Sequence, residues 1–105
     1  MKVRKVLVRS WAFDEDRGRL MLFSGMTRPS NTFNTAVPAD LWEWNPDANA
    51  WTLCSAGSPQ PQARISGHML FDASRHALLL MAGTGYDSTS TSVGAVHDLW
   101  EWAIP

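Results

Sequence analysis

Apolar residues occur in short runs that polar turns, glycines and prolines interrupt, and no run keeps the 3.6-residue period of an amphipathic helix. The runs are rich in β-formers, and Gly, Pro, Asn and Asp bound them, which is typical of strands. The pattern predicts no helix and strands at about 10–13, 20–23, 40–44, 50–54, 68–71, 78–81 and 98–102. We therefore expect an all-β fold.

One stretch, Asp-Leu-Trp-Glu-Trp, occurs without change at residues 40–44 and 98–102. Moving the sequence along itself so that Asp40 falls on Asp98 also aligns Phe13 with Phe71 and Gly25 with Gly83. This displacement is called the repeat shift below. Self-similarity at a fixed spacing is the signature of a repeat architecture. The chain is therefore predicted to contain two copies of one structural unit.

Within each copy, side chains alternate along the repeated block. Period 2 places Trp42 and Trp44 on one face of the strand, and Leu41 and Glu43 on the other. We expect Glu43 and its counterpart Glu101 to pair with arginines across an interface between the units. The apolar runs at 20–23 and 78–81 are continuous, which predicts strands that are buried on both faces.

Glycine, proline and small polar residues mark the connections. Gly25 and Gly83 end the second strand of each copy, where a glycine suits a positive φ or a close backbone approach. Residues 26–39 and 84–97 are predicted to be irregular polar loops. Residues 55–63 are predicted to be a linker that continues no strand.

As a set, these features resemble kelch-repeat β-propeller blades, such as those of bacterial kelch proteins and galactose-oxidase-like central domains. The resemblance covers nearly the whole chain and is carried by the Asp-Leu-Trp-Glu-Trp block, the Asn-Pro turn at 45–46 and the following Trp51. The glycine pair of the family is reduced here to Ser24-Gly25 and Ala82-Gly83. The resemblance implies that the repeat residues are structural: Trp42, Trp44, Trp51, Trp100, Trp102, Gly25 and Gly83.

The resemblance implies four-stranded propeller blades, with one blade at 9–58 and a second at 59–105 that lacks its own fourth strand. Residues 1–8 are expected to form an arm that either completes the second blade of a neighbouring chain or extends the first strand of its own. Propellers have about four to eight blades. We therefore expect homo-oligomerisation to complete the ring, with a trimer of six blades favoured and a tetramer of eight possible.

The polar loops are candidates for binding, because in the resembled family this face contacts partners or substrates. Aromatic residues and arginines among small polar residues are typical of recognition surfaces. The alternative is that these are merely solvated loops. The candidate contacts are Arg28, Asn31, Phe33, Asn34, Arg64, Tyr86, Asp87, Ser88, Thr89 and Ser90.

Composition narrows the function classes. The 105 residues are 45% hydrophobic and 18% charged, with a net charge of −1, which argues for a globular chain and against a general nucleic-acid or membrane-surface binder. The single cysteine, Cys54, is expected to be half-buried in a strand and excludes an intrachain disulfide. No signal-peptide pattern or membrane-length apolar run occurs, so we expect a soluble, by default cytoplasmic, chain.

Catalytic chemistry has little support in the sequence. His68, His76 and His97 lack ligand spacing, so no metal or other cofactor is predicted. Nucleophile and phosphate-loop motifs are also missing. We expect a non-catalytic, self-assembling scaffold that binds a protein or glycan through its loops. The alternatives are a repeat-derived fragment that only self-assembles and, with less support, an enzyme with a shared site on the ring axis.

Overall fold

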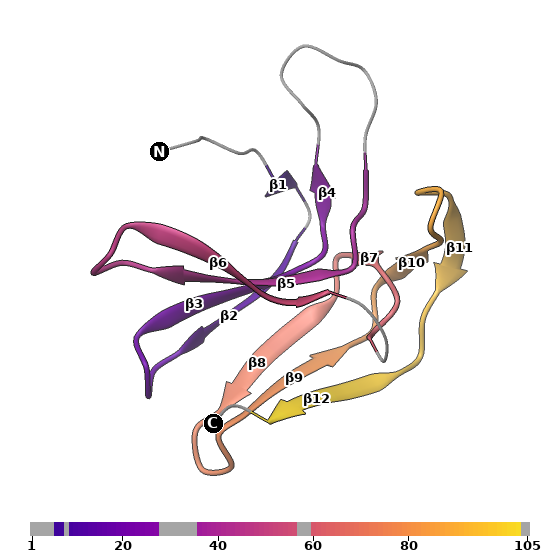
Figure 1. The fold of residues 1–105 in the computed structure, drawn as a ribbon. Coiled ribbons are helices and arrows are strands. Elements are labelled where there is room, and N and C mark those ends of the chain that lie inside the picture. Colours follow the sequence, from indigo (N-terminus) through magenta and orange to yellow (C-terminus); the bar gives the residue numbers. More distant parts are fainter. Residues whose placement is uncertain (1–5, 8, 28–35, 57–59, 104–105) are drawn as a thin grey trace.

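The computed structural model describes residues 6–7, 9–27, 36–56 and 60–103. Within these ranges the chain has twelve β-strands and no helix, so the prediction of an all-β fold is confirmed. Most strands belong to two antiparallel sheets, sheet I and sheet II (Figure 1). Sheet I has the order β2-β3-β5-β6, with β2 Ser10–Asp14, β3 Arg19–Phe23, β5 Asp40–Asn45 and β6 Ala50–Ala56. Sheet II has the order β12-β9-β8, with β8 His68–Asp72, β9 Ala77–Met81 and β12 Leu99–Ala103.

Sheet II repeats sheet I in register. Every Cα pairing between β8 and β9 is a β2–β3 pairing moved by the repeat shift, so that Ser10 pairs with Phe23 and His68 with Met81. The β9–β12 pairing repeats the β3–β5 pairing in the same way. The two sheets differ at the outer edge. In sheet I, β5 pairs with a further strand, β6, whereas in sheet II β12 has one neighbour, β9, among the described residues.

The hairpin turns of both sheets are built alike. Asp14, Asn45 and Asp72 begin the turns, and their side-chain oxygens accept backbone N–H groups within the turn. Asp14 Oδ1, for example, accepts from Asp16 and Arg17 at 3.1 and 3.2 Å. Each turn closes on a residue of positive φ, which reverses the chain into the next strand. These closing residues are Gly18, Asn49 and His76.

Sheets I and II pack against each other, with β2 beside β8. Phe23 of sheet I meets Trp102 of sheet II with ring centroids 5.3 Å apart. The covered face of sheet I consists of Ala12, Met21, Phe23 and Leu41. The covered face of sheet II consists of Met69, Phe71, Leu78, Leu80, Trp100 and Trp102. The core of the chain therefore lies between the two sheets.

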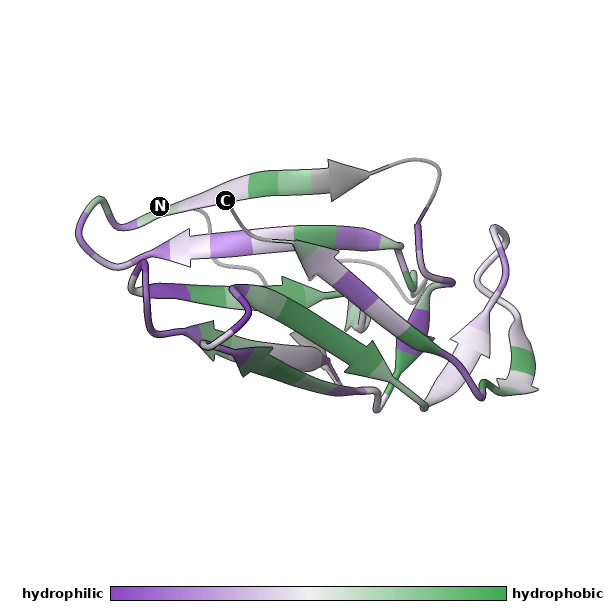
Figure 2. Ribbon diagram, turned by 90° about the horizontal axis from the view of Figure 1, so that it is seen from below, coloured by the Kyte–Doolittle hydropathy of each residue, from purple (hydrophilic) through white to green (hydrophobic). Residues whose placement is uncertain are grey.

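The opposite faces are also apolar, and among the described residues no further sheet packs on them. On β2, β3 and β5 the open face of sheet I consists of Trp11, Phe13, Leu20, Leu22, Trp42 and Trp44, and on β6 it continues with Leu53 and Trp51, which pair with Trp42 and Trp44. The open face of sheet II consists of Leu70, Leu79, Met81 and Leu99. Figure 2 shows green, apolar residues gathered along the strands of both sheets and purple, polar residues in the turns.

An arginine from the hairpin turn ties each sheet together on one face. In sheet I, Arg17 bonds Asp14 at 2.6 Å and Glu43 at 2.8 Å. In sheet II, Arg75 pairs with Glu101 and approaches Asp72 at 3.8 Å. Both arginines act within their own sheet, so the prediction that these glutamates pair across an interface between units is wrong. Cys54 is exposed rather than half-buried, because no strand of sheet II lies opposite β6.

Short strands continue the repeat at the end of the sheets away from the hairpin turns (Figure 1). They are β1 Val6–Leu7, β4 Met26–Thr27, β7 Arg64–Ile65, β10 Thr84–Tyr86 and β11 Ser92–Ala95. The β1–β4 pairing reappears, moved by the repeat shift, as the β7–β10 pairing. The predicted irregular loops are therefore partly strand, and β6 extends into the predicted linker as far as Ala56.

The two repeat glycines end β3 and β9 as predicted. Gly25 has φ 87° and Gly83 has φ 100°. A Cβ on Gly83 would lie 2.6 Å from the carbonyl oxygen of Ile65, so this position also needs a close backbone approach. The preceding residues, Ser24 and Ala82, have positive φ as well. Both copies thus keep the backbone geometry of a glycine pair although one glycine is replaced.

Candidate binding site

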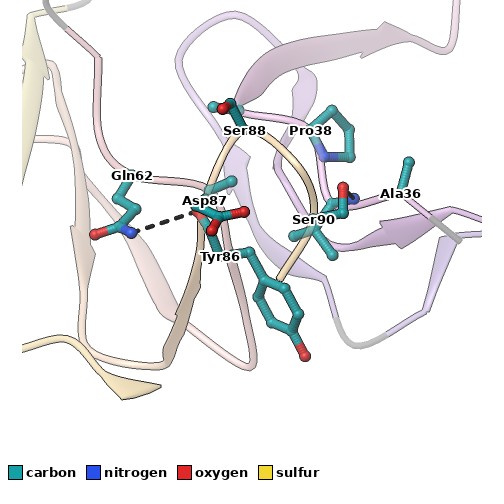
Figure 3. A pocket seen from close by; sticks show the side chains of 10 residues that line it. Ala36, Pro38, Gln62, Tyr86, Asp87, Ser88 and Ser90 are labelled. Carbon is teal, nitrogen blue, oxygen red and sulfur yellow. Dashed lines mark hydrogen bonds between the residues drawn. The ribbon is translucent and has the colours of Figure 1, made fainter. Parts of the chain in front are cut away.

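The two repeats meet at a cleft of about 570 Å³. One wall comes from the segment between β4 and β5, and the other from the turn after β10 (Figure 3). The residues before β7 close the space between these walls. The lining residues are Ala36, Val37, Pro38, Ala39, Gln62, Ala63, Tyr86, Asp87, Ser88 and Ser90. A cleft between two repeats is a common place for a binding site, because each repeat contributes one wall.

The turn after β10 is built around Asp87. Its Oδ1 accepts a hydrogen bond from the Thr89 hydroxyl at 2.6 Å and from the backbone N–H groups of Thr89 and Thr91 at 2.9 and 3.0 Å. The Thr89 hydroxyl bond, followed by the Thr91 N–H bond, lowers the pKa of Asp87. The carboxylate is therefore ionised over the physiological pH range and holds the turn in one conformation.

Hydrogen bonds join the two walls of the cleft. The backbone N–H of Val37 donates to Ser90 Oγ at 3.1 Å, across a sequence separation of 53 residues. The N–H of Tyr86 donates to the carbonyl of Ala63 at 2.8 Å, and Gln62 Nε2 donates to the Tyr86 carbonyl at 3.4 Å. Figure 3 shows Tyr86 directing its ring away from Gln62. The cleft is thus preformed, which lowers the entropy cost of binding.

Arg64 lies beneath the cleft and is fully buried. Its guanidinium bonds both oxygens of Asp98 at 2.6 and 2.7 Å and donates to the carbonyls of Gln62 and Ala82 at 3.0 Å each. These bonds to Arg64, and then the indole N–H of Trp100, lower the pKa of Asp98. Arg64 was predicted to contact a ligand on the loop face, and its burial rules that role out. It anchors the start of the second repeat instead.

The other predicted contacts divide into two groups. Tyr86, Asp87, Ser88 and Ser90 come together in the cleft, and Thr89 lies exposed on the same turn. The second group lies outside the described residues: Arg28, Asn31, Phe33 and Asn34. Sequence reasoning missed the remaining residues that line the cleft: Ala36, Val37, Pro38, Ala39, Gln62 and Ala63. Their small size and lack of charge gave no signal, apart from their place beside the polar loops.

The chemistry of the lining is that of hydrogen bonding. Asp87 and Tyr86 are its ionisable residues, and Gln62 with the two serines adds neutral donors and acceptors. In the described part of the chain, no group of three or more His, Cys, Asp or Glu is placed to hold a metal ion. Of the three histidines, His76 makes an ion-pair contact of 2.7 Å with Asp16, between the turns of the two sheets.

Comparison with models of known protein families gives no match, and comparison with curated proteins gives none either. None of the described residues belong to a helix of the length and apolar character that crossing a membrane requires. The fold and the cleft therefore carry the functional argument.

Proposed function

We propose that the chain is a non-catalytic scaffold built of two kelch-like β-propeller blades, at 9–58 and 59–105, that works as a self-associated ring. Its loop face would bind a protein or glycan ligand. Sheet I supports the blade assignment, because it is a four-stranded antiparallel meander that sheet II repeats in register over three strands.

One observation carries the proposal: residues at equivalent positions of the repeat are buried in one sheet and exposed in the other. Leu41 is 2% exposed, whereas Leu99 of the second block is 67% exposed. Ala12 is likewise 7% exposed, and its counterpart Leu70 is 45% exposed. Blade faces in a repeat architecture are buried against neighbouring units. An uncovered face of this kind marks an interaction surface.

Ring size follows from the blade number. With two blades per chain, three copies would supply six and four copies eight, both within the range of about four to eight that propellers use. Six is favoured, as the kelch resemblance suggests. Residues 1–8 remain a candidate to complete the open edge of β12 in a neighbour. Their described part, β1, pairs with β4 of its own chain, which supports the alternative that the arm extends the first blade.

The cleft supports a binding role for the assembled ring. It offers the ionised Asp87, the phenol of Tyr86 and several hydroxyl and amide groups, which suit the polar groups of a protein surface or a glycan. A simpler second candidate is a repeat-derived unit whose only activity is self-assembly. The open faces alone would account for that role.

Solution mass is the test of the proposal. Light scattering after size-exclusion chromatography is expected to give a discrete mass of three or four times the 11.7 kDa chain mass. A chain that stays at 11.7 kDa across a broad concentration range would contradict the proposal. A glycan array and a protein pull-down with Tyr86→Ala as the control then separate a binding scaffold from a self-assembling unit.

A further inference from the structure

We infer that the open face of sheet II is covered by the open face of sheet I of a second copy, in the arrangement that already joins the two sheets of one chain. This inference rests on the proposed self-association and names the surfaces that carry it.

That internal contact pairs two unlike surfaces. The covered face of sheet I meets the covered face of sheet II, for instance where Phe23 contacts Trp102. The contact is closely packed, because Phe23, Leu78 and Leu80 have no exposed surface. It shows which side chains of the repeat fit together.

The open face of sheet II carries nearly the same side chains as the covered face of sheet I. The repeat shift places Leu99 on Leu41, Leu79 on Met21 and Met81 on Phe23. All of these replacements are apolar and of similar size, and such swaps preserve core packing. On β8 two replacements are larger, Leu70 for Ala12 and His68 for Ser10.

The open face of sheet I carries nearly the same side chains as the covered face of sheet II. On β2, β3 and β5, five of the six residues of this face are identical to their counterparts on the covered face of sheet II, and the sixth is Trp11 in place of Met69. Trp11 is 53% exposed and Phe13 is half exposed, so both are available to a second copy. A second copy of this chain therefore carries a surface that matches the open face of sheet II.

The polar rim of the internal contact is compatible with the same docking between copies. Arg75 and its two carboxylate partners repeat the arrangement around Arg17, so these three charges stay paired in the docked state. At the position of the Asp16–His76 contact, a second copy would bring Gly18 opposite Ser74. These two residues carry no charge and do not repel.

Because the paired surfaces differ, the contact is head-to-tail. Each docked copy still has one open face, so that addition continues until the ring closes. A two-fold contact of one open face with itself would instead stop at a dimer. The two arrangements therefore predict different behaviour for copies that lack one open face.

Two single variants and their mixture test the inference. Leu99→Asp disables the open face of sheet II, and Trp11→Asp disables the open face of sheet I; both side chains are largely exposed, so the fold should persist. By light scattering, each variant alone is expected to run at the chain mass of 11.7 kDa and their equimolar mixture at twice that mass, with no larger species. Val93→Asp is the control and should assemble as wild type, because Val93 is exposed on β11, which belongs to neither sheet I nor sheet II.

The outcomes separate this inference from the proposed function. If wild type assembles but either variant alone also does, or if the mixture stays at the chain mass, head-to-tail docking through these faces is overturned while self-association stands. If wild type never assembles, both are overturned. Circular dichroism checks that each variant is folded, and Leu70→Asp with Phe13→Asp forms a second pair should one of the first two unfold.

Discussion

Leu41 and Leu99 hold the same place in the same five-residue block, on strands with the same register, yet one is 2% exposed and the other 67%. The local sequence and the local strand geometry are alike. The difference is that sheet II lies on the face that contains Leu41, whereas no described element lies on the face that contains Leu99. Burial in a repeat protein is thus a property of the neighbouring unit, and sheet II marks where the next unit is expected.

A second difference between the repeats lies at the start of each unit. The second repeat has the buried Arg64 bound to Asp98, whereas the equivalent positions of the first repeat are Val6 and Asp40. This pair lies within the second repeat and holds Arg64 in place through charge-assisted hydrogen bonds, while the backbone of Arg64 bonds to Ser24 and Gly25 of the first repeat.

The largest effect is expected from removing the anion of that pair. Asp98→Asn leaves the guanidinium of Arg64 buried without a countercharge and should lower the free energy of unfolding by about 3 kcal/mol. Asp40→Asn is the matched control, and for this surface change we expect a loss within about 0.5 kcal/mol. Urea denaturation followed by tryptophan fluorescence measures both. Equal losses in the two variants would show that the Arg64 pair does not stabilise the fold.

The same pair predicts a pH dependence. Because Arg64 lowers the pKa of Asp98 in the folded chain below the unfolded value of about 3.9, the pair stabilises the fold above that pH. This contribution is lost as the pH falls below about 4 and through the folded pKa. Urea midpoints of wild type should therefore drop more steeply between neutral and acidic pH than those of Asp98→Asn. Parallel pH profiles would contradict the assignment.

Core packing gives the next effect. Leu78→Ala opens a cavity between the sheets, and we expect a loss of about 3 kcal/mol in the free energy of unfolding. Its counterpart Leu20→Ala, on the open face of sheet I, should cost about 1 kcal/mol in the dissociated chain, because that site is incompletely covered. If a second copy covers the open face, the loss caused by Leu20→Ala should approach the loss caused by Leu78→Ala as protein concentration rises. A difference between the two losses that does not depend on concentration would argue that Leu20 stays uncovered.

Local chemistry made much of the fold predictable. Strand alternation, the Asp and Asn residues that begin the turns, and the glycines at positive φ all act over a few residues, and they agree with the observed strands to within a few positions. The repeat spacing also predicted the equivalence of the two sheets. Each of these signals is contained in a short stretch of sequence.

Long-range partners were not predictable in this way. Arg64 was expected on the loop face because arginines among small polar residues are typical of recognition surfaces. Its burial depends on Asp98, 34 residues away, and on carbonyls that only the folded chain brings near. The cleft depends in the same way on the bond from Val37 to Ser90 across 53 residues. Residues such as Ala36 and Ala63 line it because of where the backbone runs rather than because of their own chemistry.

The smallest expected difference concerns the two turn arginines, and it bears directly on the comparison of the sheets. Arg17→Ala leaves the carboxylate of Asp14 fully buried, and solvent screens only the exposed third of Arg17, so we expect a loss of about 1–2 kcal/mol in the free energy of unfolding. Arg75→Ala removes an arginine that is more than half exposed, as is expected of a face without a cover, and its loss should be much smaller. In assembled protein the Arg75 network would become enclosed as the Arg17 network is. Arg75→Ala should then weaken assembly, measured by sedimentation, more than it weakens the isolated fold, and an unchanged association constant would place Arg75 outside the interface.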